Sequence, residues 1–362
     1  MAESNQLVDL VQTRIDEFLK TRQLIVTTVS PDLSALVNFS RQFLSGGKRF
    51  RAQFCHHGWQ SVPGSGELDS EPVIAAAAAL EIFHAAALVH DDIIDNSDTR
   101  RGSASAHKLF ETLHASGGWA GAPIEFGRAS AILLGDMLLG WSDELLDEGL
   151  QASADPVAAR LGRHEFNQMR TEVTAGQYLD ILEERAWLVQ PEEELLERAM
   201  RVIVFKSAKY SVQAPLVIGA ALAGADAAHL DALRAFGLPL GIAYQLRDDL
   251  LGVFGDAAVT GKPSGDDLRE GKRTVLIALA RHALEPAARE YLDGLLGDPG
   301  LDAAQILSLQ ELIRASGAVE SVETLITDQV ADARVALDAS PIAAGVRVQL
   351  ESLAERVTRR SF

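Results

Sequence analysis

The sequence predicts an all-α protein, and three observations support this fold class. Apolar residues recur with the helical period along nearly the whole chain, without a convincing two-residue alternation or internal repeat. Apolar residues make up 47% of the 362 residues and aromatic residues only 6%, which favours close helix packing through small side chains. No shift in composition marks a domain boundary. We therefore expect one domain over residues 1–362, a helical bundle around a central cavity.

Helices are expected wherever the helical period runs between breakers. The predicted ranges are 5–28, 32–44, 48–61, 71–95, 127–149, 155–185, 191–222, 227–255 and 271–284, followed by three more helices up to residue 358. Turn-forming residues separate helices at 63–66 and 117–123. Pro215 lies inside an otherwise helical pattern, so a kink is expected there. Residues 300–362 carry no evident chemistry and are interpreted as structural helices.

Charge and cysteine content narrow the class of protein. A net charge of -18 argues against a nucleic-acid partner, because the general affinity for nucleic acids comes from Lys and Arg that neutralise phosphates. The single cysteine, Cys55, excludes an intrachain disulfide framework and is expected in the core. No apolar run is expected to reach the ~20 residues that span a bilayer, and residues 1–6 lack signal-peptide features. We expect a cytoplasmic protein without a membrane span.

Two aspartate-rich segments carry most of the functional information. The clusters are Asp91, Asp92 and Asp95 in the first, and Asp248 and Asp249 in the second. Asp91 and Asp95 lie four apart, so their carboxylates project from the same face of a helix. Like charges this close are unfavourable without a cation, and Mg²⁺ binds carboxylate oxygens together with phosphates. The clusters therefore predict a phosphate-bearing substrate held between them through magnesium.

The plain alternative is that both clusters belong to a solvated helix face, which suits a chain with excess acid. The small apolar run 75–89 leads directly into the first cluster, however, and the apolar run 237–243 comes shortly before the second. A solvated face does not begin where a buried helix ends. The metal interpretation is therefore favoured.

Basic residues are concentrated in short motifs. Paired glycines precede Lys48 and Arg51, which lie three apart on a first helical turn and can reach one anion. Arg100 and Arg101 follow the first acidic cluster. Adjacent side chains point in different directions, so these arginines can serve two diphosphates, although ion pairing with the nearby carboxylates is the simpler alternative. Further basic positions are Lys206, Lys209, Lys262, Lys272 and Arg273.

In this order the motifs resemble the polyprenyl synthetase family, the trans-isoprenyl diphosphate synthases, from about residue 40 to 290. The matching motifs are Gly46–Arg51, Asp91–Asp95 with Arg100 and Arg101, Lys206 with Ser207, Gln245–Asp249, Gly255 with Asp256, and Gly261 and Lys262 with Lys272. The sequence is most similar to short-chain members such as the geranylgeranyl diphosphate synthases of actinobacteria. This resemblance implies a transferase of the isoprenoid synthase fold that forms a homodimer.

The resemblance also implies a role for each matching residue. Isopentenyl diphosphate would be bound by Lys48, Arg51, His84 and Arg101. The allylic diphosphate (dimethylallyl, geranyl or farnesyl) would be bound by Arg100, Lys206, Ser207, Gln245, Lys262 and Lys272. Three Mg²⁺ ions, replaceable by Mn²⁺, would be bound by Asp91, Asp92, Asp95, Asp248 and Asp249. The catalytic set would be Asp91, Asp95, Arg100, Lys206, Gln245, Asp248 and Lys262.

For two positions, His84 and Gly252, the match to the family pattern is less direct. His84 has the alternative of a core histidine, but its place two helical turns before Asp91 favours the substrate role. Many family members have a third aspartate in the second cluster where this chain has Gly252. Its absence weakens the ligand set there, and Asp256, one turn on, can contribute.

The implied reaction begins with ionisation of the allylic diphosphate, whose developing charge magnesium and the basic side chains stabilise. The double bond of isopentenyl diphosphate then attacks the allylic cation, and a proton is lost to the departing diphosphate, because no motif residue is a clear general base. Two alternatives are a class I terpene cyclase and a non-catalytic partner subunit. A cyclase needs no isopentenyl site such as residues 46–51 with Arg101, and retention of both aspartate pairs and all the basic motifs argues against a partner subunit.

The helix that leads into Asp91 predicts a product of about C20, geranylgeranyl diphosphate. With the diphosphate at Asp91, the growing chain runs back along this helix past Ala86 and Ala87, which leave room for it. Phe83 forms the floor, about 12 Å of helix rise from Asp91 at ~1.5 Å per residue, and this depth fits roughly three isoprene units. The alternatives are a Phe83 that packs into a neighbouring helix, and a farnesyl or longer product.

Overall fold

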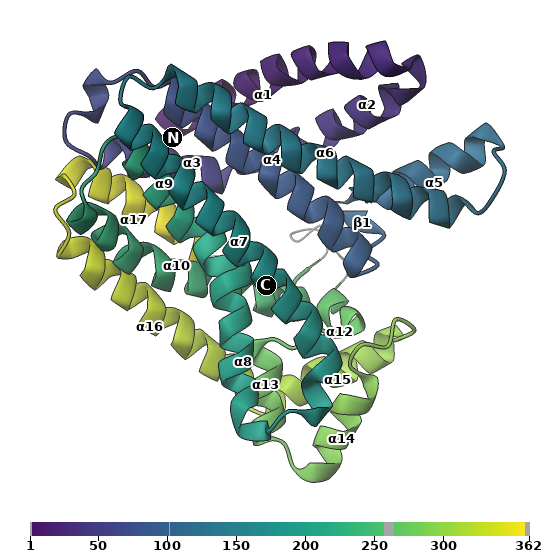
Figure 1. Cartoon of the computed structure of the whole chain (residues 1–362). Coiled ribbons are helices and arrows are strands. Elements are labelled where there is room, and N and C mark those ends of the chain that lie inside the picture. Colours follow the sequence, from purple (N-terminus) through teal and green to yellow (C-terminus); the bar gives the residue numbers. More distant parts are fainter. Residues whose placement is uncertain (1, 101, 257–263, 359–362) are drawn as a thin grey trace. The chain divides into compact units, whose positions relative to one another are not determined.

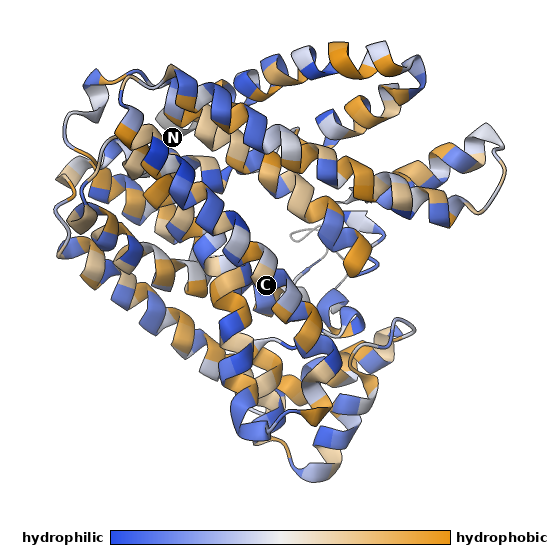
Figure 2. Ribbon diagram, in the orientation of Figure 1, coloured by the Kyte–Doolittle hydropathy of each residue, from blue (hydrophilic) through white to orange (hydrophobic). Residues whose placement is uncertain are grey.

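The computed structural model describes residues 2–100, 102–256 and 264–358, and most of them are helical, which confirms the all-α prediction (Figure 1). The chain divides into two compact units. The first is Met1–Glu165 with Pro215–Asp226, and the second is Phe166–Ala214 with Ala227–Phe362. Figure 2 shows polar and apolar residues alternating along most of the helices, as in amphipathic helices that bury one face.

The first unit packs around the apolar helix α4 (Glu71–Ile94), which contacts α3 and α6. Its other elements are α1 (Ala2–Val29), η1 (Pro31–Leu33), α2 (Ser34–Phe43), α3 (Phe50–Gln60), η2 (Ser65–Glu67), α5 (Ala106–Gly117), α6 (Pro123–Ala152), the first part of α7 (Pro156–Ala186) and most of α9 (Ala214–Leu222). β1 (Thr99–Arg100) pairs antiparallel with β2 (Ser103–Ala104). This short hairpin is the only β structure among the residues that the structure describes.

Helix α4 corrects one expectation from the sequence. It is long enough and apolar enough to cross a bilayer, with a mean hydropathy of 1.9 in its most apolar stretch, so the expectation that no such run exists was wrong. Of that stretch, 83% is buried inside the protein. Residues 72–83 are buried without interruption, many of them alanines against which neighbouring helices pack closely. The helix therefore serves as the core of its unit.

The second unit packs around α10 (Ala227–Phe254), which contacts η5 (Ile203–Gln213) and α16 (Ala318–Asp338). Its other elements are the rest of α7, η3 (Trp187–Val189), η4 (Glu192–Glu194), α8 (Leu195–Val202), α12 (Asp266–Glu270), α13 (Val275–Ala283), α14 (Pro286–Leu295), α15 (Ala303–Ala315) and α17 (Ala344–Thr358). Both terminal nitrogens of Arg247 on α10 donate to the Glu323 carboxylate on α16 at 2.6 Å. Helix α16 thus helps to hold α10, the helix that carries the second acidic cluster, in position.

Several elements differ from the sequence prediction. Helices α5 and α12 lie in segments to which no helix was assigned, and four helices rather than three occupy residues 285–358. α12 has only five residues, with left-handed glycines at both ends, so its hydrophobic period is too short to detect. Before Pro215 the chain is wound as a π-helix, η5, in which the Ala214 N–H donates to the Lys209 carbonyl five residues back. A simple kink was expected at Pro215. The structure instead has this wider π-helical turn just before the proline, which lacks a backbone N–H.

In the second unit, α7 and α10 both contact η5 through their backbones. A Cβ atom at Gly176 of α7 would lie 2.4 Å from the Lys206 nitrogen, and one at Gly241 of α10 would lie 2.5 Å from the Ala208 carbonyl oxygen. No side chain fits in those spaces without a backbone shift. Glycine at both positions therefore fixes η5, and with it Lys206, against α7 and α10.

We predict that Gly241→Ala lowers the free energy of unfolding by about 1–3 kcal/mol, because the added methyl group overlaps the η5 backbone. The matched control is Gly140→Ala in α6, where the position is exposed and a Cβ meets nothing within 4 Å. There the same change should raise stability by roughly 0.5–1 kcal/mol, since alanine favours helix. Denaturant unfolding measures both, and stabilisation at both positions would contradict the close contact.

Candidate active site

The loop before α3 presents Lys48 at the surface and is held by its neighbour Arg49. Gly46 and Gly47 take φ values of 67° and 87°, which are left-handed conformations suited to glycine. Arg49 is buried, and its guanidinium contacts the Glu81 carboxylate of α4 at 3.3 Å. The Arg49–Glu81 ion pair thus ties the glycine-rich loop to the middle of α4.

The same anchor brings together three residues predicted to bind isopentenyl diphosphate. His84 lies three residues after Glu81 on α4 and is half-buried, so it shares the helix face on which the loop is anchored. Arg51 is half-buried in the first turn of α3, where the adjacent Ala52 N–H donates to Glu81 at 3.2 Å. The fourth predicted residue, Arg101, lies outside the described residues.

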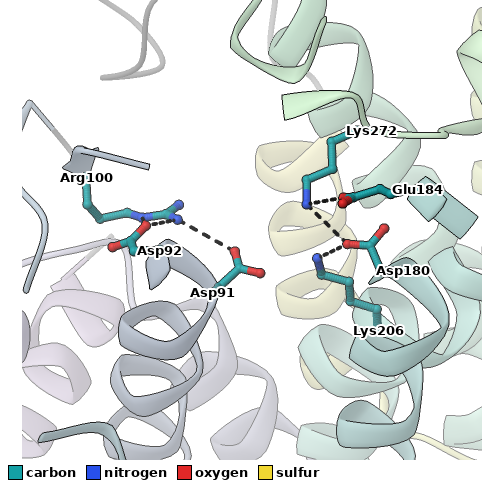
Figure 3. Close-up of polar contacts among 7 residues, drawn as sticks. All are labelled: Asp91, Asp92, Arg100, Asp180, Glu184, Lys206 and Lys272. Atoms are coloured by element: carbon teal, nitrogen blue, oxygen red, sulfur yellow. Dashed lines mark hydrogen bonds and ion pairs between the residues drawn. The ribbon is translucent and has the colours of Figure 1, made fainter. Parts of the chain in front are cut away.

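The first acidic cluster ends α4 (Figure 3). The Asp95 N–H donates to the Asp91 carbonyl at 2.8 Å, so the helical turn that places both carboxylates on one side is intact. Asp92 is buried, and its carboxylate accepts a hydrogen bond from Arg100 Nε at 2.9 Å. Arg100 also lies 3.6 Å from the Asp91 carboxylate. The first cluster therefore combines the carboxylates of Asp91 and Asp95 with an arginine that Asp92 holds in place.

In the second unit, two lysines converge on one carboxylate (Figure 3). Lys206 of η5 forms a short ion pair with Asp180 Oδ2 on α7, and Lys272 Nζ lies 3.3 Å from the same oxygen. Lys272 also contacts Glu184 at 3.0 Å. Burial raises the pKa of the Glu184 carboxyl, and the Lys272 charge opposes that shift. Two ammonium groups from separate elements thus meet at a single oxyanion.

The second acidic cluster lies on α10, where Gln245 Nε2 donates to the Asp249 carboxylate at 2.8 Å. Burial raises the pKa of the Asp249 carboxyl well above its usual range; the Gln245 hydrogen bond opposes this, and the charges of Asp267 and Asp248 add to it. Asp248 itself is half-buried. Lys262, predicted to bind the allylic diphosphate, lies outside the described residues.

The carboxylates suit magnesium without forming a closed cage. Within residues 2–100, 102–256 and 264–358, no group of three or more His, Cys, Asp or Glu side chains is placed so that it could hold a metal ion by itself. Mg²⁺ usually takes one or two carboxylates and completes its octahedron with water and substrate phosphates. The i, i+4 pair Asp91 and Asp95, and the adjacent Asp248 and Asp249, are hard oxygen donors of that kind. The donor set therefore fits an ion shared with a diphosphate.

The residues of the chain-length prediction lie along α4 before Asp91. Phe83 and Ala86 are buried, whereas Ala87 is half-buried. Phe83, Ala87 and Asp91 follow one another at intervals of four, so they share one helix face. The required order, a small residue near the diphosphate end and a bulky one beyond it, is present. That Phe83 acts as the floor stays a prediction.

Three residues of these clusters were not predicted from the sequence. Asp180 and Glu184 lie four apart within the predicted helix 155–185, the spacing that had marked Asp91 and Asp95, so the same criterion applied there would have found them. No sequence pattern marked the role of Arg49, because its partner Glu81 is distant in sequence. An arginine within a basic motif is also more readily interpreted as a further phosphate ligand.

Comparison with known proteins identifies the family of this chain. A family model for polyprenyl synthetases matches residues 34–313. The crystal structure of a geranylgeranyl pyrophosphate synthase from Corynebacterium glutamicum, complexed with isoprenyl diphosphate and magnesium, has a TM-score of 0.93 and 40% identity, covering 99% of each chain. A short chain isoprenyl diphosphate synthase of Methanocaldococcus jannaschii is 30% identical over 84% of this chain and 81% of its own length. A geranylfarnesyl diphosphate synthase of Natronomonas pharaonis is 29% identical over 98% of this chain and 99% of its own length.

All three relatives are isoprenyl diphosphate synthases, and none is a terpene cyclase. The family match covers every motif on which the resemblance rests, from the glycine-rich loop before α3 to Lys272. The chain therefore belongs to the polyprenyl synthetase family and is a transferase of the trans-isoprenyl diphosphate synthase type.

Proposed function

We propose that this enzyme joins isopentenyl diphosphate to an allylic diphosphate (dimethylallyl, geranyl or farnesyl) and releases geranylgeranyl diphosphate. The observation that carries the proposal is the convergence of Lys206 and Lys272 on Asp180. A diphosphate presents oxygens with more negative charge than a carboxylate, so it can replace Asp180 as the partner of both ammonium groups. The likeness to the Corynebacterium glutamicum geranylgeranyl pyrophosphate synthase supports the product.

The two substrates are assigned to different clusters. Isopentenyl diphosphate is assigned to Lys48, Arg51, His84 and Arg101, and the allylic diphosphate to Arg100, Lys206, Ser207, Gln245, Lys262 and Lys272. The Arg49–Glu81 anchor supports the first assignment, since it holds the basic loop on the helix face of His84. The lysine pair supports the second assignment, because its two members already share one oxyanion.

Magnesium is assigned to Asp91, Asp95, Asp248 and Asp249, with three ions per active site and Mn²⁺ as a substitute. When bound, it stabilises the negative charge that develops on the departing diphosphate. Asp92 was also predicted as a ligand, but its buried carboxylate already accepts from Arg100. We assign Asp92 to orienting Arg100 toward the allylic diphosphate.

The side chains then perform the following steps. Arg100, Lys206 and Lys272 balance the charge on the allylic diphosphate as its carbon–oxygen bond breaks. The π electrons of isopentenyl diphosphate form the new carbon–carbon bond to the allylic carbon. A proton leaves the adjacent carbon of the resulting cation and passes to an oxygen of the departing diphosphate, because no motif side chain is a clear general base. The products are the allylic diphosphate with its lengthened isoprenoid chain, and inorganic diphosphate, which carries the transferred proton.

The proposal includes the arrangement of the whole protein. We propose a single catalytic domain, residues 1–362, whose activity needs both acidic clusters, and a homodimeric, cytoplasmic enzyme without a nucleic-acid partner. The family membership supports the domain and the dimer, and the net charge of -18 supports the absence of a nucleic-acid partner.

We predict that turnover requires Mg²⁺ or Mn²⁺ and that Asp91→Ala and Asp248→Ala each lower kcat by about 100-fold or more, because each removes charge stabilisation needed in the transition state. Asp328→Ala, an exposed carboxylate on α16, is the control and should leave kcat unchanged. Steady-state assays with labelled isopentenyl diphosphate measure this. Full turnover in excess chelator would exclude the metal-dependent mechanism.

The two-site assignment predicts selective effects on KM. Lys48→Ala, Arg51→Ala and His84→Ala should raise KM for isopentenyl diphosphate about tenfold or more, whereas Lys272→Ala should do so for the allylic substrate, because each loses a charge-assisted phosphate contact. Lys20→Ala, an exposed lysine on α1, is the control. Equal effects of all four variants on both substrates would show that the two sites are wrongly divided.

The chain-length model predicts opposite shifts in product length. Phe83→Ala should lengthen the products beyond C20, because it opens the floor on α4, and Ala87→Phe should shorten them toward C15. The geranylfarnesyl diphosphate synthase relative makes a longer product the second candidate for the wild type. Phe18→Ala, equally buried on α1, controls for lost core packing and should leave product length unchanged. Chromatography of the products decides, and an unchanged distribution in both α4 variants would refute the model.

A further inference from the structure

Position 252 of α10 carries no side chain, yet the space above it is filled. Gly252 lies four residues after Asp248, so a side chain there would project from the same helix face as the Asp248 carboxylate. A Cβ atom at this position would lie 1.9 Å from Asp267 Oδ2, 2.3 Å from its Cγ and 2.7 Å from its Oδ1. The whole carboxylate of Asp267 therefore occupies the place of the absent side chain.

Backbone hydrogen bonds fix the main chain at Asp267, from which this carboxylate projects. Asp267 belongs to α12, which begins after Gly265 at φ 72° and ends at Gly271 at φ 78°. The Asp267 carbonyl accepts the N–H groups of both Gly271 and Lys272 at 3.0 Å. The turn that presses the carboxylate onto α10 is therefore also the turn that delivers Lys272 to Asp180.

This geometry reproduces in the second cluster the pattern of the first. In the first cluster, Asp91 and Asp95 offer two carboxylates one helical turn apart on one face. On α10, Asp248 offers one, and one turn further on the carboxylate comes from α12 and rests on the bare helix backbone. A glycine is required at 252 for this arrangement, because even a methyl group would displace the oxygen atoms.

We propose that Asp267 supplies the third carboxylate of the second acidic cluster and contributes to holding the divalent cation there. The inference rests on the proposed magnesium-dependent function and deepens it. It also accounts for the departure at Gly252: the carboxylate is not lost from the site but reaches it from another segment of the chain. The competing explanation is that Asp267 only ties α12 to α10.

The first test measures the Mn²⁺ bound to the full-length protein by equilibrium dialysis, with the same concentration of inorganic diphosphate in both chambers, so that only ions retained with the protein are counted. Asp267→Asn keeps the shape of the side chain but removes its charge, and it should weaken Mn²⁺ binding about tenfold or more. Gly252→Ala should have a similar effect, because its methyl group pushes the carboxylate away without changing any charge. Asp266→Asn, the neighbouring residue in α12, is the matched control and should bind as the wild type does.

The second test moves the carboxylate from α12 back to α10. In the double variant Gly252→Asp with Asp267→Ala, the truncation frees the space and the new aspartate returns a carboxylate to it. Mn²⁺ binding should recover several-fold relative to Asp267→Ala alone. If Asp267 only ties the two helices together, the double variant gains nothing, because the tie remains broken.

Each outcome decides a separate question. A wild-type protein that binds no Mn²⁺ in the presence of diphosphate would overturn the proposed metal-dependent function itself. Normal wild-type binding with unchanged binding by Asp267→Asn would overturn only the role of Asp267, as would a double variant that fails to recover. Circular dichroism on every variant confirms that folded proteins are compared, so that a loss of binding cannot be a loss of fold.

Discussion

The second unit depends on the absence of side chains where its helices touch. Gly176 brings α7 against the backbone of η5 at Lys206, and Gly241 brings α10 against Ala208 of the same segment. Because the helix backbones are this close, side chains from different helices can contact one another without being fully extended. Lys206 can then meet Asp180 while keeping little conformational freedom to lose when a substrate binds. The close helix packing and the Lys206–Asp180 ion pair therefore have the same structural cause.

Opposite charges hold the site in order before any ligand arrives. Asp92 orients Arg100, and Asp180 and Glu184 gather Lys272. Such pairs are only partly exposed, so each replaces water contacts that the charged groups lost on folding. In the proposed function, a substrate diphosphate would replace Asp180 as the partner of the two lysines, whose side chains are already held together. Such an arrangement would be electrostatic preorganisation, because the cations would not have to move when negative charge develops on the diphosphate.

Helix α4 serves two purposes with one sequence. Its alanine-rich run lets neighbouring helices pack closely around it, and in the proposed function the small side chains of Ala86 and Ala87 would leave room for the growing chain near Asp91. The apolar character that makes it resemble a membrane span is thus explained by its central place in the first unit. Because Glu81 on this helix also anchors the glycine-rich loop through Arg49, a change in the core of α4 also affects the basic motif.

The sequence by itself determined the helical fold, the acidic clusters and the order of the basic motifs, because helical period, four-residue spacing and local motif order are properties of neighbours along the chain. It missed α5, α12 and the π-helical winding of η5, which are short or depend on packing. Only the tertiary structure paired Arg49 with Glu81 and Lys272 with Asp180, and placed Asp267 over Gly252. Such contacts join residues far apart in sequence, and no local pattern specifies which distant carboxylate a helix face will meet.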